Sequence, residues 1–118
     1  MAARDRIWRE GERAAWEAYR ARGYRLVARN WRCPLGELDL VIARGHLLVF
    51  CEVKARAGAQ LGGPFEAVTV SKQRKLRQLA EVFVSAVRPR ASTFRFDVAS
   101  VTWRRDGPPA VHLFEDAF

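Results

Sequence analysis

Apolar and polar residues alternate with two different periods along this chain, and each period predicts one kind of secondary structure. An apolar stripe with the helical period runs through residues 5–22 and again through residues 71–87, which predicts two helices. Gly23 ends the first helix, and Ser71 is the expected N-cap of the second. Alternating or continuous apolar segments predict strands at 24–30, 37–44, 47–54, 93–103 and 110–114. The order α-β-β-β-α-β-β predicts an α/β fold with a mixed β-sheet flanked by helices.

The second and third predicted strands form a hairpin, which is the most informative part of the pattern. Two residues beginning with glycine separate them and suit a type II′ turn, so that Asp39 faces Glu52 and Glu37 faces Lys54. Side chains alternate along a strand, so these four charged residues share one face at the open end of the hairpin. The other face is expected to carry Leu38, Leu40, Ile42, Val49, Cys51 and Val53.

Length and composition then limit the class of protein. The 118 residues, 49% of them hydrophobic, predict a single domain over residues 1–118 with one core. The longest wholly apolar run, Leu47–Cys51, is far shorter than the roughly 20 residues of a membrane-spanning helix. The two cysteines, Cys33 and Cys51, form no Cys-x-x-Cys motif and fit a reducing compartment. We therefore expect a cytoplasmic protein without a membrane segment.

The positive charge of the chain is uneven. There are 21 basic and 13 acidic side chains, a net charge of +8. Residues 1–32 and 71–95 are strongly basic, whereas residues 33–70 between them are slightly acidic. A phosphate-binding surface around a carboxylate site has this distribution, and so do two ordinary solvated helices. Arginine outnumbers lysine 18 to 3, which GC-rich coding alone also explains.

The charged end of the hairpin has the residue types of a metal site. Two carboxylates about 4 Å apart repel each other by roughly 4 kcal/mol at an effective dielectric constant near 20. A shared proton, a paired cation or a metal ion relieves that repulsion. Asp39 and Glu52 offer the hard oxygen ligands that Mg²⁺ prefers, and the Val53 carbonyl can add another. With Lys54 beside them, these groups suit metal-assisted phosphodiester hydrolysis, although a surface ion-pair network is the alternative.

The motifs around this site resemble those of a known family. Gly36–Leu40 (GELDL) and Val49–Arg56 (VFCEVKAR) resemble the YraN-like family of bacterial proteins. The resemblance extends to Gly11–Ala15 (GERAA) and to Arg95–Val98 (RFDV), and it spans roughly residues 10–103. That family is similar to the PD-(D/E)xK, or restriction-endonuclease-like, superfamily.

The resemblance implies a restriction-endonuclease-like fold and a role for several residues. Asp39 would be the acidic metal ligand, Glu52 the second acid and Lys54 the catalytic lysine. Glu12 would match the helix glutamate that archaeal Holliday-junction resolvases direct into their site. The apolar stripe of the first helix independently contains this glutamate. The implied cofactor is Mg²⁺ or Mn²⁺ and the implied partner is DNA, branched or single-stranded, while a homodimer is left open.

The remaining assignments concern nucleic-acid contacts and two further acids. The expected contacts to phosphate are made by Lys72, Arg74, Lys75 and Arg56. The alternative for the first three is a solvated helix face. Glu37 either binds the metal, pairs across the strands with Lys54 or only begins the strand, and Asp97 is expected to be structural. The predicted function is a metal-dependent endonuclease selective for DNA structure; the alternative is a non-catalytic nucleic-acid-binding protein with the same fold.

Overall fold

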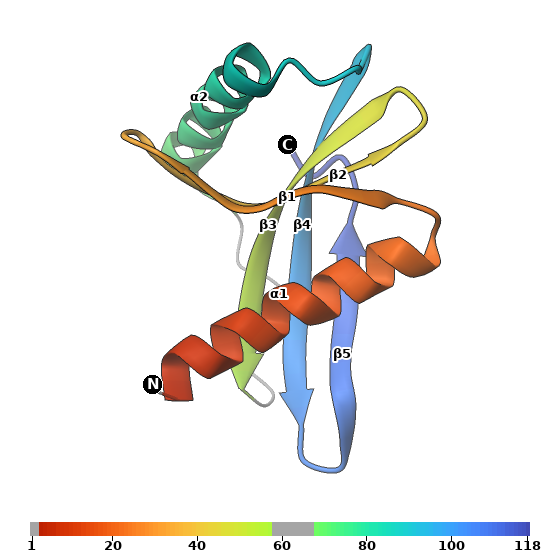
Figure 1. The fold of residues 1–118 in the computed structure, drawn as a ribbon. Coiled ribbons are helices and arrows are strands. Elements are labelled where there is room, and N and C mark those ends of the chain that lie inside the picture. Colours follow the sequence, from red (N-terminus) through yellow and green to blue (C-terminus); the bar gives the residue numbers. More distant parts are fainter. Residues whose placement is uncertain (1–2, 58–67) are drawn as a thin grey trace.

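The computed structural model describes residues 3–57 and 68–118, and their order of elements confirms the predicted helix, three strands, helix and two strands (Figure 1). The side chains described are those of residues 9–55 and 68–118. The elements are α1 (Ala3–Ala21), β1 (Arg25–Cys33), β2 (Gly36–Arg44), β3 (Leu47–Ala57), α2 (Val70–Val87), β4 (Thr93–Arg104) and β5 (Gly107–Phe114).

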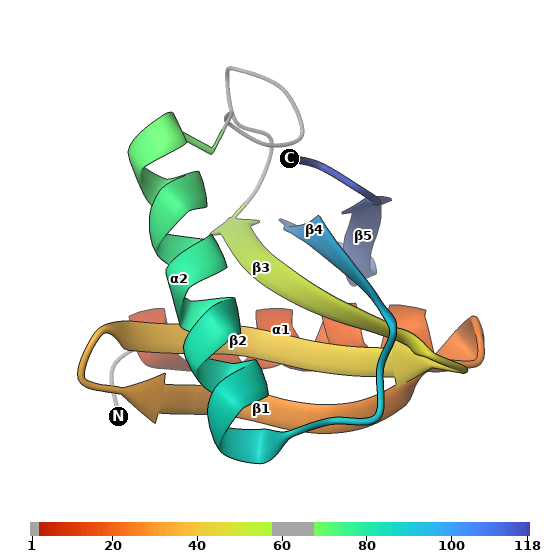
Figure 2. The ribbon, with the colours of Figure 1, turned by 90° about the horizontal axis from the view of Figure 1, so that it is seen from above.

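The five strands form one mixed sheet in the order β1-β2-β3-β4-β5. Neighbouring strands are antiparallel except β3 and β4, which are parallel and are connected through α2. Helix α1 crosses one face of the sheet and α2 lies over the other, as Figures 1 and 2 show. The fold is therefore the predicted α/β structure, a mixed sheet with a helix on each face. No helix in the described part of the chain is both long and apolar enough to cross a membrane.

The register of the predicted hairpin is confirmed along the paired part of β2 and β3. Arg44 pairs with Leu47, and the ladder continues to Leu40 opposite Cys51. Gly45 has a φ of +59°, which the first position of a type II′ turn requires. The ladder ends at the Leu40–Cys51 pair, one residue short of Asp39 and Glu52. The acidic end of the hairpin is thus the place where β2 and β3 separate.

Each face of the sheet has its own hydrophobic core. On the α1 side, Tyr19 packs with Leu40, Val49 and Val53. The core on the α2 side is built from residues of β2, β3, β4 and α2, among them Val41, Leu48, Phe50, Leu76, Leu79, Phe83 and Val98. Alternating side chains of the same strands therefore supply both cores, which explains why β2 and β3 are apolar on both faces.

Leu38 corrects the predicted assignment of faces. Strict alternation placed Leu38 beside Leu40, but it packs in the α2-side core instead. Its partner on β1 is Trp31, whose ring meets that of Phe83 edge-on at 5.2 Å between centroids. In the residues before Leu40, β2 no longer pairs with β3 and pairs with β1 alone. The twist of this pair turns the Leu38 side chain toward the α2-side core.

The ends of α2 follow capping rules, with one correction to the prediction. The N-cap is Thr69 rather than Ser71, because the Thr69 hydroxyl accepts a hydrogen bond from the Lys72 N–H at 3.1 Å. The helix ends at Val87, as predicted. Arg88 follows in the left-handed region, with a φ of 53°, and its N–H donates to the carbonyl of Val84 at 2.9 Å.

Asp97 is a buried carboxylate of β4 that connects this strand to α1 and to the C-terminal segment. Arg95 donates to both of its oxygens at 2.8 Å, and the Tyr19 hydroxyl of α1 donates to Oδ2 at 2.8 Å. The Asp116 N–H, after β5, donates to Oδ1 at 3.0 Å. The same Arg95 guanidinium donates to the hydroxyl of Tyr24 at 3.0 Å. This arrangement makes Asp97 a structural residue that fixes α1 and the C-terminal segment to β4.

We predict that Asp97→Asn destabilises the protein by about 3 kcal/mol, because it leaves the largely buried Arg95 charge paired only with the more exposed Glu115, at 3.5 Å. Tyr19→Phe, which removes the hydroxyl that contacts Asp97 and, at 3.4 Å, the Cys51 sulfur, should cost about 1 kcal/mol. Urea unfolding at neutral pH measures both losses. Asp106→Asn, on the exposed turn before β5, is the matched control and should change stability by less than about 0.5 kcal/mol. Equal stability of the Asp97 and Asp106 variants would refute this role.

Candidate metal centre

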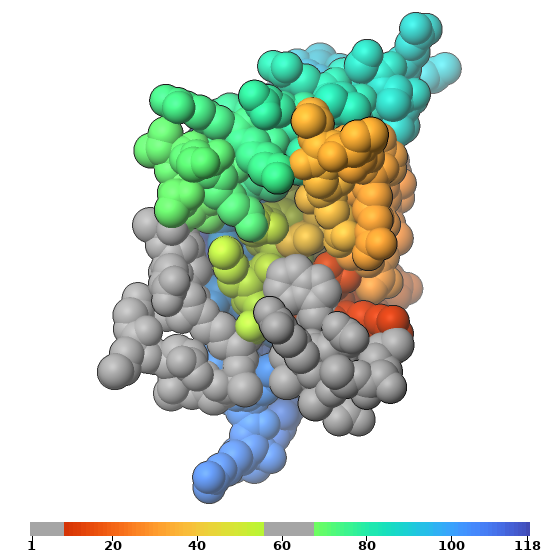
Figure 3. Space-filling model, turned by 90° about the vertical axis from the view of Figure 1, so that its left-hand side faces the viewer, coloured from red at the N-terminus to blue at the C-terminus, as the bar shows by residue number. Residues whose placement is uncertain are grey.

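A cavity of about 540 Å³ lies where β2 and β3 separate, beneath the N-terminal half of α2. Figure 3 looks onto this side of the molecule, where β3 lies in a hollow between α2 and the β1–β2 hairpin. Three of the four predicted catalytic residues line the cavity directly. Its lining residues are Gly36, Glu37, Asp39, Glu52, Val53, Lys54, Lys72, Lys75, Leu76 and Leu79.

The Asp39 side chain connects β2 to β3 at the point where their backbone pairing ends. Its Oδ2 accepts a hydrogen bond from the Val53 N–H at 2.9 Å, where the next ladder bond from β2 would otherwise be. A residue in an extended strand directs its N–H and C=O to the same neighbour, so the Val53 carbonyl faces the gap as well. That orientation suits the ligand role predicted for this carbonyl, which stays a prediction.

Asp39 and Glu52 shift each other's pKa in opposite directions. Burial, and then the hydrogen bond to Glu52 and its charge, raise the pKa of Asp39 to about 9. Burial alone would raise the pKa of Glu52 too, but the hydrogen bond with Asp39 and the ion pair with Lys72 outweigh it and lower that pKa. These shifts favour a neutral Asp39 beside an ionised Glu52 at neutral pH.

Lys72 enters the acidic site from α2. Its Nζ lies 2.8 Å from Glu52 Oε2, and this hydrogen-bonded pair raises the pKa of Lys72. The sequence interpretation assigned Lys72 to DNA phosphate, so this contact was missed. Lys54 also lines the cavity, where its charge helps to lower the pKa of Glu52. The site thus presents two ammonium groups to the Asp39–Glu52 pair, one from β3 and one from α2.

Glu12 reaches the same place from the opposite helix. It is almost fully buried, and one carboxylate oxygen each of Glu12, Glu37 and Asp39 lie within 4.8 Å of one another. Glu37 also accepts a hydrogen bond from Arg32 Nε at 2.8 Å, so its cross-strand partner is this arginine rather than Lys54. These three carboxylates could hold a metal ion. The predicted metal ligands share only Asp39 with this cluster, while Glu52 lies next to it through its hydrogen bond with Asp39.

Gly11 explains how α1 brings Glu12 so close. A Cβ at Gly11 would lie 2.7 Å from the Cβ of Ala55 on β3, closer than real side chains approach. The helix can therefore contact β3 at this point only with glycine, and the next residue is the buried glutamate. The sequence contains this signal as the pair Gly11-Glu12, but only the packing reveals the role of the glycine.

The residues predicted to bind nucleic acid lie in different places. Lys72 and Lys75 line the cavity, whereas Arg74 is exposed on α2 and outside it. The side chain of Arg56 lies outside the described residues. Gly36, with a φ of +147°, leaves room for Lys75, because a Cβ there would lie 3.3 Å from the Lys75 Cε. The structure thus brings two of the four predicted cations to the acidic site.

The fold and the cavity define a small α/β protein with an acidic site at a separated strand pair, and comparison with known proteins gives the family. The chain belongs to the Uncharacterised protein family UPF0102, whose sequence pattern matches residues 11–101. This confirms the YraN-like resemblance at the level of the family. The matched range begins at Gly11 and includes every charged residue that lines the cavity.

Relatives match nearly the whole chain. A UPF0102 protein of Clavibacter michiganensis subsp. michiganensis is 43% identical over 117 residues, which cover 99% of both chains. A UPF0102 protein of Symbiobacterium thermophilum is 43% identical over 113 residues, 96% of both chains. One of Beutenbergia cavernae is 46% identical over 114 residues, 96% of this chain and 97% of its own.

We predict that Gly11→Ala destabilises the protein by about 1–3 kcal/mol, because the added methyl group forces α1 away from Ala55. Alanine has a helix propensity about 1 kcal/mol more favourable than that of glycine, so a loss of stability would be opposite to the effect of propensity alone. Urea unfolding measures the change in the free energy of unfolding. Gly107→Ala is the matched control, since a Cβ there meets nothing within 4 Å. A stabilised Gly11 variant would contradict the proposed close contact.

A second prediction follows from the raised pKa of Asp39. Its folded-state pKa of about 9 exceeds the ordinary aspartate pKa of 3.8, so between those two pH values the folded protein holds a proton that the unfolded chain has released. Without metal, stability should therefore fall as pH rises through that window, by up to about 1.4 kcal/mol per pH unit from this group. Asp39→Asn should remove that slope and Asp106→Asn should keep it, as measured by urea unfolding between about pH 6 and pH 8. An unchanged slope in Asp39→Asn would place the proton elsewhere.

Proposed function

We propose that this protein is a metal-dependent nuclease that hydrolyses phosphodiester bonds in DNA, with a restriction-endonuclease-like site. One observation carries the proposal. Carboxylates from α1 and β2 converge within 4.8 Å beside a cavity that Glu52 and three lysines also line. Acids and ammonium groups in one cavity suit a substrate that is itself a phosphate and needs both a cation and a proton acceptor.

The donor set fits a hard divalent cation. Glu12, Glu37 and Asp39 offer only oxygen atoms, the ligand type that Mg²⁺ and Mn²⁺ prefer. The metal would polarise a phosphate oxygen and lower the pKa of a bound water. Asp39 would give up its proton as it became a ligand, since a ligating carboxylate must be ionised. The acidic cluster is therefore better suited to a loaded site than to a metal-free one.

The other charged groups have complementary roles in hydrolysis. Glu52 is held ionised by Lys72, so at neutral pH it can accept a proton from an attacking water. Lys54 is on the same strand, where its ammonium can stabilise charge that develops on the phosphate. Lys72 acts through Glu52 and is a positioning residue, a role that differs from the phosphate contact expected from the sequence.

DNA is the partner that the charge distribution favours. Lys75 of α2 lines the cavity on one side, and the exposed Arg29 and Arg32 of β1 lie on the hairpin. Cations beside an acidic centre allow phosphates to approach carboxylates that would otherwise repel them. Such contacts are made to the backbone, so we propose selectivity for DNA structure, such as branches, flaps or ends.

The test is a cleavage assay with Mg²⁺ or Mn²⁺ on a panel of single-stranded, flapped, four-way and duplex DNA. We expect cutting that stops on chelation of the metal. Asp39→Ala and Lys54→Ala should each lower the cleavage rate by roughly 100-fold or more. Arg105→Ala, on the exposed β4–β5 turn, is the control and should cut normally.

DNA binding is measured in parallel with chelator present. Lys54→Ala should bind DNA within a few fold of wild type, and affinity should fall steeply with salt. Equal cutting by wild type and Lys54→Ala would assign the activity to a contaminating nuclease. Salt-dependent binding by a wild type that never cuts would establish the non-catalytic alternative.

A further inference from the structure

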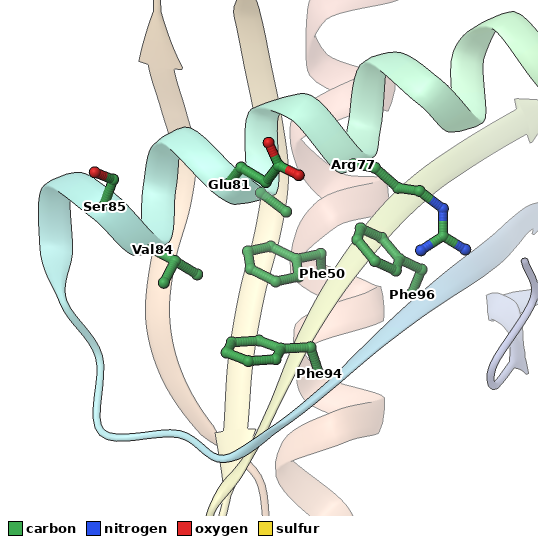
Figure 4. A pocket seen from close by; sticks show the side chains of 8 residues that line it. Phe50, Arg77, Glu81, Val84, Ser85, Phe94 and Phe96 are labelled. Carbon is green, nitrogen blue, oxygen red and sulfur yellow. The ribbon is translucent and has the colours of Figure 1, made fainter.

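A second cavity lies on the other flank of α2, away from the acidic site. Its volume is about 430 Å³, within the range of small-molecule pockets of about 300–1,000 Å³. Figure 4 shows three phenylalanine rings from β3 and β4 on one side and the side chains of α2 on the other. The lining residues are Phe50, Arg77, Ala80, Glu81, Val84, Ser85, Phe94 and Phe96.

The rings form a layered aromatic wall that is open at one end. Phe50 and Phe96 are stacked at 5.4 Å between centroids, and both are nearly buried. The Arg77 guanidinium lies 4.7 Å above the centroid of Phe96. Phe94, in contrast, is 47% exposed, so one of its faces is free to receive another flat group. The cavity therefore presents a ring surface to solvent rather than a closed core.

Polar and positive groups surround this aromatic wall. The Glu81 carboxylate and the Ser85 hydroxyl, on exposed residues of α2, can accept or donate hydrogen bonds at the edge of a bound ring. Arg77 is part of the cavity, and Arg88 and Arg90 are exposed directly after α2. A ligand that matches all three features has a flat aromatic group, a polar edge and a negatively charged backbone.

We propose that this cavity binds one unpaired base of a single-stranded nucleic acid, stacked on Phe94. Base–aromatic stacking beside a basic surface is the usual way in which proteins hold single strands. A second copy of this chain fits the cavity less well. Docking two such faces would bring Arg77, Arg88 and Arg90 of one copy against those of the other. The charge around the cavity thus favours a polyanion.

The position of the cavity connects it to the acidic site. Lys72 and Lys75 on one flank of α2 line the acidic cavity, and Arg77 on the other flank lines the aromatic one. With 100° per residue, Arg74 falls on the outer face between the flanks, where it is exposed. A strand that crosses α2 would meet these cations in turn. The inference rests on the proposed function for the nature of its ligand, and it makes a strand with an unpaired base near the cut the preferred substrate.

The experiment measures binding of the full chain, with chelator present so that nothing is cut. Two short single-stranded DNA probes are compared by fluorescence anisotropy, one with normal bases and one with abasic sites. Phe94→Ala should weaken binding of the normal probe by roughly tenfold, the contribution of one stacked base. It should leave the abasic probe unchanged. Phe94→Trp should keep the affinity, and its fluorescence should be quenched by the normal probe alone.

Val70→Ala is the matched control, because Val70 is 61% exposed on α2 and outside both cavities. It should bind both probes as wild type does. An equal effect of Phe94→Ala on both probes, or no effect on either, would overturn the proposal. So would a wild-type dimer that Phe94→Ala dissociates in sedimentation, since a second copy would then occupy the cavity. Base-dependent binding by a protein that never cuts DNA would sink the nuclease proposal and leave this one standing.

Discussion

The hydrogen bond from the Val53 N–H to the Asp39 carboxylate is the interaction on which the site depends. Beyond the Leu40–Cys51 pair, β2 and β3 no longer pair, so the buried Val53 N–H of β3 has no backbone acceptor on β2. A buried N–H must be satisfied, and the Asp39 side chain satisfies it across the gap. The gap stays open as a result, and carboxylates from α1 and β2 can converge there.

The open gap has an electrostatic consequence that shapes the rest of the site. Four acids near one another in a poorly solvated cavity would repel strongly if all were ionised. Two features reduce that repulsion in the metal-free protein. The raised pKa of Asp39 favours its protonated, neutral form, and Lys72 forms an ion pair with Glu52. A divalent cation would displace the proton on Asp39 and bind the same carboxylate oxygens. The arrangement therefore concentrates repulsion at the place where the carboxylates could hold a metal ion.

Much of the fold, and part of the site, could be predicted from the sequence because regular strands and helices impose their periods on side chains. The hairpin register and the convergence of Asp39, Glu52 and Lys54 on one cavity follow from alternation about a two-residue turn. Alternation failed at Leu38, where the strand pairing on which it depends had ended. The contact between Lys72 and Glu52 could not be predicted, because it depends on how far α2 extends over the sheet, and no local pattern encodes that distance.

The motifs Gly11–Ala15 and Arg95–Val98, which lie farthest from the hairpin in the sequence, both help to position α1. The hydroxyl of Tyr19 is bound by buried Asp97, and Gly11 lies directly against Ala55 of β3. Glu12 lies seven residues before Tyr19, two helical turns away on the same face. A rigid helix fixed at two points cannot rotate or slide, so both contacts together determine where the Glu12 carboxylate lies. Asp97 thus acts on the acidic site without touching it: it sets the register of the helix that supplies one of the three convergent acids.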